Sequence, residues 1–228
     1  MAKIKKKKRV LKIKNICIFI AILISIIGLT YYIITMPIKN IYIKGNNIIS
    51  DNEIIEGTNL YQYPSFVLTS KKALIKSIKK NPYVKSVIIN KKLGNIIEIN
   101  IEEYVPISIT NEEQIIIENG NILENSYNLM DIPILSNNIE NKEVYNNFVN
   151  KFSKINPNIL RQISQIEYSP IEVDKDRFLL YMNDTNLIYI TLTKINKLNK
   201  YNKIKDVLEG KTGIIYLDSG NYVELKNI

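Results

Sequence analysis

The chain is 228 residues long, carries a formal net charge of +9, and contains one cysteine but no histidine or tryptophan. Without histidine, the sequence excludes Ser-His-Asp triads, histidine general bases and histidine-based zinc or transition-metal sites. The cysteine, Cys17, lies in an apolar stretch, so the rest of the chain has no thiol for a disulfide. A hydrolase that uses two carboxylates remains open. No phosphate-binding glycine loop or nucleophile-elbow pattern occurs, and we expect no enzyme activity, cofactor or metal.

The stretch from Ile16 to Ile38 contains no charged side chain and is flanked by Lys14 and Lys39. A helix of this length rises roughly 34 Å, enough to cross the roughly 30 Å hydrocarbon core of a bilayer. A buried helix of a soluble protein normally shows a polar stripe, which is missing here. The sequence therefore predicts a single transmembrane helix over residues 15–38.

The charge of the chain is concentrated before this helix. Residues 1–14 carry eight basic groups and no acidic one, so the other 214 residues carry only +1 of the total of +9. Basic residues beside an apolar span mark its cytoplasmic side. We expect a basic cytoplasmic tail over residues 1–14 and an extracytoplasmic position for the bulk of the chain. The tail is no evidence for nucleic-acid binding. Anionic lipid or a cytoplasmic partner is a second interpretation of the tail.

A cleaved signal peptide is the alternative to a permanent membrane anchor, since it also has a basic start and an apolar centre. The apolar stretch is too long for that class, and its end (ITMPIKN) offers no small-x-small cleavage site.

The first external segment predicts a small sheet covered by two helices. Residues 38–44 alternate as in a half-buried strand. Ser50 and Glu53 fit a capping box, which predicts a short helix closed by Gly57. A second helix is expected from about residue 70, with an apolar stripe, ended by Asn81-Pro82. Two strands over residues 84–91 and 95–104 form a predicted hairpin, in which alternate isoleucines of the second strand point inward.

The later part predicts a second, mixed domain that begins after Pro106. Expected strands cover residues 107–109, 114–118, 163–168, 178–182, 187–192, 213–217 and 221–225. Apolar residues recur at helical spacing from residue 141 to 155, which predicts one helix. A last helix is expected over residues 194–209, with Leu198, Tyr201, Ile204 and Leu208 inward and Gly210 closing it.

Three runs in the first external segment resemble the POTRA domain of the FtsQ/DivIB family. They are Lys44-Gly45-Asn46 at a strand end, Asn81-Pro82-Tyr83-Val84 before a hairpin, and Ile-x-Ile-x-Glu-x-x-Pro from Ile99 to Pro106. Looser likenesses extend over the second domain, where Gln165 stands in place of the family's acidic residue. The resemblance implies an α+β protein with a transmembrane helix, a POTRA domain (β-α-α-β-β) over 39–106, and a mixed domain with a mostly antiparallel sheet over 107–228.

The resemblance also implies a function. Members of this family are non-enzymatic scaffolds of bacterial division, concentrated at the septum. The implied partners are single-pass proteins of the FtsL and FtsB/DivIC types, and through them the septal wall synthase. The alternative is a membrane-anchored accessory protein of wall assembly or transport that uses its POTRA domain to bind peptides.

Strand addition is the expected mode of binding, since a terminal strand has an edge that a partner can extend. The candidate strand residues are Tyr216, Leu217, Tyr222, Val223 and Leu225, which could equally be ordinary core or a covered edge. Lys197, Lys200 and Lys203 could pair with acidic partner residues, or form a solvated helix face. The POTRA edge over Ile41, Tyr42, Ile43 and Lys44 is a second candidate.

Overall fold

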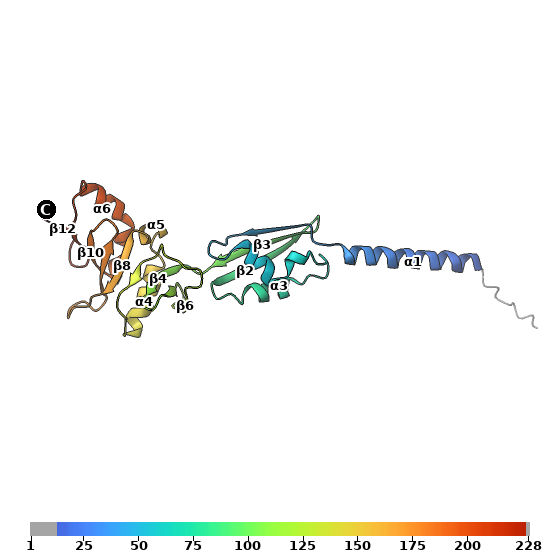
Figure 1. Ribbon diagram of the computed structural model, residues 1–228, viewed down its shortest axis with the longest axis horizontal. Helices are drawn as coiled ribbons and strands as arrows, with labels where there is room; N and C mark the ends of the chain where they lie inside the picture. Colours follow the sequence, from blue (N-terminus) through green and yellow to red (C-terminus); the bar gives the residue numbers. More distant parts are fainter. Residues whose placement is uncertain (1–12, 227–228) are drawn as a thin grey trace, which may run out of the picture. The chain divides into compact units, whose positions relative to one another are not determined.

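The computed structural model describes residues 13–226 (Figure 1). Contacts divide the chain into two compact units, one extending to Glu102 and the other beginning at Glu103. Most of the predicted basic tail, residues 1–12, lies outside the described residues.

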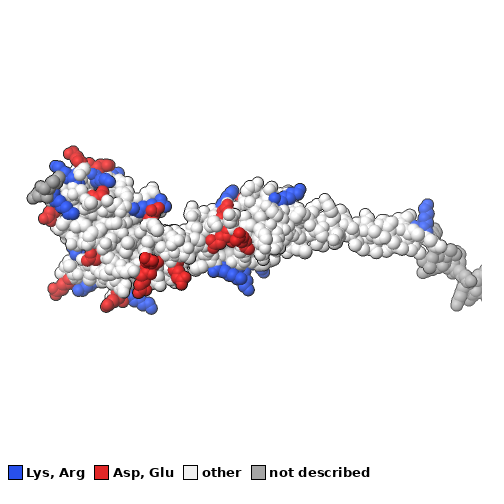
Figure 2. Space-filling model, viewed as in Figure 1, with Lys and Arg blue, Asp and Glu red and all other residues white. Residues whose placement is uncertain are grey.

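The predicted apolar helix is present as α1 (Ile13–Thr35), and none of its residues is buried. Figure 2 shows it as a surface free of charged side chains between its two ends. Its two threonine hydroxyls bond within the helix: Thr30 Oγ1 donates to the Ile26 carbonyl at 2.6 Å and Thr35 Oγ1 to the Tyr31 carbonyl at 2.9 Å. A hydroxyl that bonds to the backbone of its own helix suits an apolar surrounding. Among the described residues it is the one helix long and apolar enough to cross a membrane.

The rest of the first unit is the predicted β-α-α-β-β fold. Its strands β1 (Asn40–Lys44), β2 (Val84–Lys92) and β3 (Ile96–Glu103) form a sheet in the order β1-β3-β2, with β1 parallel to β3. The alternate residues Ile97, Ile99 and Ile101 are buried, as the sequence predicts. The helical segments are α2 (Asp51–Gly57), η1 (Leu60–Gln62) and α3 (Lys71–Ile78).

Local capping explains where these helices begin. Ser50 Oγ accepts the Glu53 N–H at 3.2 Å, and Ser70 Oγ accepts the Ala73 N–H at 3.4 Å. The predicted role of Gly57 as the residue after α2 is wrong. Gly57 is the last helical residue, and Thr58 follows it as the cap. Thr58 Oγ1 donates to the Ile54 carbonyl at 2.7 Å, so a side chain satisfies the end that a glycine would otherwise close.

The second unit is organised around a nine-stranded sheet in the order β12-β11-β10-β9-β8-β7-β4-β5-β6. The pairs β4–β7, β7–β8 and β10–β11 are parallel and the others are antiparallel. The strands are β4 (Pro106–Thr110), β5 (Gln114–Ile117), β6 (Ile122–Glu124), β7 (Ile134–Leu135), β8 (Ile163–Tyr168), β9 (Arg177–Met182), β10 (Leu187–Thr191), β11 (Gly213–Tyr216) and β12 (Tyr222–Leu225).

Helices pack their apolar faces on this sheet to form one core. The helices are α4 (Lys142–Phe152), α5 (Pro157–Leu160), η2 (Leu192–Lys200) and α6 (Tyr201–Val207). Phe148 and Phe152 of α4 contact Phe178 of β9, with ring centroids 5.5 and 6.0 Å apart. The predicted helix over residues 141–155 is thereby confirmed as α4 with a buried apolar stripe.

The single helix predicted over residues 194–209 is instead two segments, η2 and α6. The buried side chains Leu192, Ile195, Leu198 and Tyr201 are spaced by exact threes. Three residues per turn is the repeat of a 3₁₀ helix, whereas an α-helix would rotate some of them out of the core. The spacing of the core residues therefore explains the tighter winding.

Candidate partner-binding edge

The strand β12 ends the nine-stranded sheet, so one side of its backbone pairs with β11 and the other has no neighbouring strand within residues 13–226. The Lys226 N–H donates to the Thr212 carbonyl at 2.9 Å. In an antiparallel pair, the residues that exchange hydrogen bonds alternate with those that do not. The backbones of Tyr222 and Glu224 therefore bond to β11, and those of Val223 and Leu225 point outward. This outward edge can accept another strand.

A ladder of aromatic side chains crosses the sheet face next to this edge. Tyr222 stacks on Tyr216 with ring centroids 4.6 Å apart, and Tyr216 stacks on Tyr189 of β10 at 5.5 Å. The Arg177 guanidinium of β9 lies 3.8 Å from the centroid of the Tyr189 ring. Stacked rings and a guanidinium over a ring attract each other beyond the area they bury. The ladder thus connects the edge strand to the centre of the sheet.

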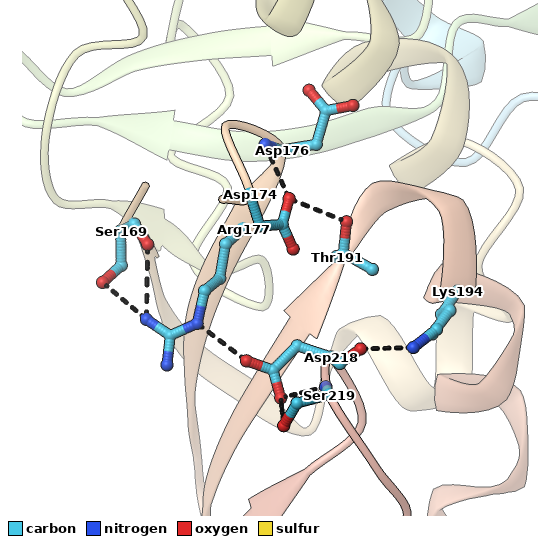
Figure 3. Close-up of polar contacts among 8 residues, drawn as sticks. All are labelled: Ser169, Asp174, Asp176, Arg177, Thr191, Lys194, Asp218 and Ser219. Carbon is cyan, nitrogen blue, oxygen red and sulfur yellow. Dashed lines mark hydrogen bonds and ion pairs between the residues drawn. The ribbon is translucent and has the colours of Figure 1, made fainter. Parts of the chain in front are cut away.

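An ion pair holds the turn between β11 and β12 (Figure 3). Arg177 Nε donates to Asp218 Oδ2 at 2.7 Å, and the two side chains are only 13% and 8% exposed. The Ser219 N–H donates to Asp218 Oδ1 at 2.7 Å, and Lys194 Nζ donates to the Asp218 carbonyl oxygen. Burial alone would raise the pKa of Asp218, but the bonds from Arg177 and Ser219 hold it below its ordinary value. Asp218 therefore stays ionised at neutral pH and fixes the turn.

A second buried polar cluster holds the start of β11. Asn186 Oδ1 accepts the Gly213 N–H at 2.9 Å, and its Nδ2 donates to the Tyr201 hydroxyl oxygen at 3.0 Å. The Tyr201 hydroxyl donates to Asp184, whose two oxygens lie 2.7 and 2.8 Å away. Burial first, and the neighbouring carboxylate second, raise the pKa of Tyr201, so the hydroxyl remains a donor. Both ends of β11 are thus fixed by groups distant in sequence.

Gly213 is also needed for the close approach of β12. A Cβ atom at this position would lie 2.4 Å from the Glu224 carbonyl oxygen, a distance that no side chain tolerates. The absence of a side chain therefore allows the two strands to pair here.

Comparison with known proteins shows to which family the chain belongs. Residues 36–104 match the model of the POTRA domain, FtsQ-type. A cell division protein DivIB from Bacillus cereus is 30% identical over 195 residues, covering 82% of this chain and 75% of the relative. The chain belongs to the DivIB family. A DivIB from Bacillus anthracis is 29% identical, covering 96% of this chain and 86% of the relative. The extracytoplasmic domain of DivIB from Geobacillus stearothermophilus is similar at 23% identity and a TM-score of 0.39, covering 47% of this chain and 96% of that domain.

In this DivIB-family chain, the structure distributes the five predicted strand residues over four environments. Tyr222 and Leu225 are exposed on β12, while Val223 is half-buried against the core. Tyr216 lies within the aromatic ladder. Leu217 is 4% exposed and belongs to the core, so its side chain offers nothing to a partner. The alternation of β11 explains this, because Ile215 and Leu217 share the helix-covered face.

The three predicted lysines also differ. Lys197 Nζ donates to Asn221 Oδ1 at 2.7 Å and so supports the β11–β12 turn. Lys200 and Lys203 are exposed. A lysine that the sequence did not single out, Lys205, pairs with Asp184 at 3.2 Å.

The predicted POTRA edge is β1, which lies at one side of the three-stranded sheet. Ile41 and Ile43 are half-buried, whereas Tyr42 and Lys44 are exposed. Lys44 Nζ and Lys92 Nζ lie 3.2 and 2.6 Å from the carboxylate oxygens of Glu98 on β3. The bonds from Lys92 and then Lys44 lower the pKa of Glu98. The ion pairs beside this edge join exposed lysines to Glu98, and the buried polar residues Ser108, Asn186 and Thr191 all lie in the second unit.

Sequence reasoning missed Arg177, Asp218 and Asn186 as determinants of the β11–β12 edge. Arg177 and Asp218 are 41 residues apart, so no local spacing connects them. Asn186 lies between the predicted strands 178–182 and 187–192, and nothing in that segment indicates that it is buried, at 2% exposure. In a chain rich in asparagine, a buried one carries no distinguishing sequence signal.

Proposed function

We propose that this protein is a membrane-anchored, non-enzymatic scaffold of the bacterial division machinery. In this proposal α1 crosses the cell membrane once with the N-terminus in the cytoplasm (a type II topology), and both units lie outside at the septum. The chain binds single-pass partners of the FtsL and FtsB/DivIC types and thereby helps control septal peptidoglycan synthesis. Membership in the DivIB family of cell division proteins supports this role.

The membrane anchor is supported by the chemistry of α1. From Ile16 on it carries no charged side chain, and none of its 23 residues is buried, so the described part of the protein does not cover it. Exposing such a surface to water opposes the hydrophobic effect, whereas a bilayer removes that cost. The basic residues that precede α1 support the cytoplasmic position of the N-terminus.

The free edge of β12 is the observation that carries the binding mechanism. Its outward backbone groups at Val223 and Leu225 are positioned to bond to an added strand, as in β-augmentation. The strand is short and its turn is fixed by Asp218, so little ordering is required on binding. Exposed Tyr222 and Leu225 offer apolar contacts beside the added strand.

A proline at Leu225 tests the mechanism. Leu225→Pro removes one outward N–H and leaves the bonds between β12 and β11 in place, and edge strands tolerate proline. We expect the full-length variant, reconstituted with a DivIC-type partner, to lose most of its capture of that partner. The matched variant Leu225→Ala removes the same side chain but keeps the N–H, so it should retain most of the binding.

Two outcomes would contradict strand addition at β12. Equal capture by the proline and alanine variants would show that the backbone edge is not used. Undiminished capture after deletion of residues 213–228 would exclude the whole hairpin. If a fluorescent fusion stayed uniform around the envelope and depletion left septation normal, the accessory role in wall assembly or transport would be favoured.

A further inference from the structure

Two loops of the first unit are bonded to the end of α1. The Ser65 hydroxyl and the Phe66 N–H donate to backbone carbonyls of residues 34–36, the second at 2.8 Å. Asn95, which follows the β2–β3 turn, donates from Nδ2 to the Pro37 carbonyl at 3.0 Å. Loop 63–68 and the β2–β3 turn are therefore fixed beside the residues at which the proposed membrane span ends.

Both loops carry exposed apolar side chains. Leu93, in the β2–β3 turn, is 97% exposed, and Leu68 is 69% exposed. Val67 and Tyr63 are about half exposed. Lys91 Nζ donates to the carbonyls of Phe66 and Val67, which ties one loop to the other. A soluble surface rarely gathers large apolar side chains in this way unless another apolar phase covers them.

Exposed basic residues accompany these apolar ones. Lys39 lies four residues after α1, and Lys92, which also pairs with Glu98, adjoins Leu93. Lys71 and Lys72 occupy the first turn of α3, three and four residues after Leu68. Cations are disfavoured at a helix N-terminus, because the positive end of the helix dipole lies there. A negatively charged surface facing these residues would offset that repulsion.

We propose that loop 63–68 and the β2–β3 turn insert their apolar side chains into the outer interface of the bilayer that α1 crosses. This inference rests on the proposed membrane anchor. Pro37 lies two residues beyond α1, roughly 7 Å along an extended chain. The headgroup region on each side of a bilayer is roughly 5–8 Å thick. Lipid is therefore the phase within reach of Leu93 and Leu68, and the lysines face its anionic headgroups.

Insertion at two loops in addition to the span would fix the tilt of the POTRA unit. The bonds from Ser65, Phe66 and Asn95 already join the unit to the end of α1. Two inserted loops add two points of contact with the membrane, and three points of contact define a plane. The edge strand β1, which begins at Asn40, would then be presented at a constant angle to the membrane.

Depth measurements with single tryptophans test this inference, because the chain has no native tryptophan. The full-length protein is reconstituted in nanodiscs that contain anionic phospholipid, with and without bromine atoms on the upper part of the acyl chains. Leu93→Trp and Leu68→Trp are the test variants. Ile88→Trp is the matched control, because Ile88 is exposed on the same hairpin, five residues and roughly 16 Å along β2 from Leu93. Tyr32→Trp reports on α1 itself.

We expect strong quenching and a blue-shifted emission for the tryptophans at positions 93 and 68, and unquenched emission at position 88. Tryptophan itself prefers the membrane interface, so a second variant removes that bias. Adding Leu93→Asn to Leu68→Trp should weaken the quenching at position 68, since the turn then loses its apolar tip. Far-ultraviolet circular dichroism confirms that each variant is folded.

The outcomes separate the two proposals. Quenching at position 32 without quenching at positions 93 and 68 would overturn interfacial insertion and leave the anchor intact. No quenching at position 32 would overturn the anchor. Equal quenching at positions 88 and 93 would also overturn the inference, because it would show contact without insertion of the loop tips.

Discussion

Two of the edge strands of this protein, β1 and β12, are held in different ways. The POTRA edge strand β1 has an ion pair between Lys44, whose side chain is 66% exposed, and Glu98, whose side chain is 13% exposed. The hairpin that carries β12 depends on buried groups, Asn186 at its start and the Arg177–Asp218 pair at its turn. Exposed pairs contribute about 0–1 kcal/mol, whereas breaking a buried pair costs about 3–5 kcal/mol. The contacts that hold the β11–β12 hairpin are therefore expected to contribute more stability than those at β1.

This difference indicates which edge is prepared for binding. An edge whose backbone is already ordered loses less conformational freedom when a partner strand adds to it. The edge β12 meets this condition through contacts with β9, β10 and η2. The edge β1 is ordered on one side by β3 and at its start by the residues that join it to α1.

The largest expected effect is at the buried ion pair. Asp218→Asn keeps the shape of the side chain but leaves the Arg177 charge without its partner. We expect a loss of about 3 kcal/mol in the free energy of unfolding of the second unit, at the lower end for buried pairs. Arg177 keeps its weaker bonds to Ser169 and its contact with Tyr189. Chemical denaturation of the full-length chain in detergent, followed by hydrogen exchange at β11 and β12, measures this loss.

The pH dependence provides the control for that variant. The folded-state pKa of Asp218 lies below its ordinary value, so its contribution is complete above the unfolded value of about 3.9. The contribution is lost as the pH falls through the folded value. The difference between native and Asp218→Asn chains should therefore be constant from about pH 5 to 8 and shrink in stronger acid. A difference that grew on acidification would contradict the role given to Asp218.

A medium effect is expected where β11 and β12 meet closely. Gly213→Ala places a Cβ against the Glu224 carbonyl oxygen, so the strands must separate. Overpacking of this kind costs about 1–3 kcal/mol. The matched control is Gly57→Ala in α2, where nothing lies within 4 Å of the added atom. That change should be neutral or stabilise the first unit by about 0.5–1 kcal/mol. Equal thermal stabilities of the two variants would contradict the close approach at Gly213.

The smallest effect is expected at the POTRA edge. Lys44→Ala removes an exposed lysine from its pair with Glu98, which keeps its bond to Lys92. The free energy of unfolding should change by less than about 1 kcal/mol. Comparison of this variant with Asp218→Asn by the same denaturation measurement sharpens the contrast between the edges. A loss at Lys44 as large as that at Asp218 would remove the contrast.

Much of the fold was predictable because its signals are local. Alternation located Ile97, Ile99 and Ile101 on the inner face of β3, and Ser50 located the start of α2 through the N–H group three residues on. The sequence prediction missed the 3₁₀ segment η2. It assumed one α-helix whose inward residues begin at Leu198 and include Tyr201, Ile204 and Leu208. The earlier members of the series, Leu192 and Ile195, extend the threefold spacing.

The sequence alone determined most strands, the helices α2, α3 and α4, the apolar span and the family, because each depends on residues a few positions apart or on a continuous motif. Only the tertiary structure decided which strands lie at the edges, which outward backbone groups are free, and that Arg177, Asn186 and Asp218 meet around one hairpin. Those contacts join residues 27 to 41 positions apart. Their formation depends on the packing of the whole sheet, and such long-range pairing leaves no periodic trace in the chain.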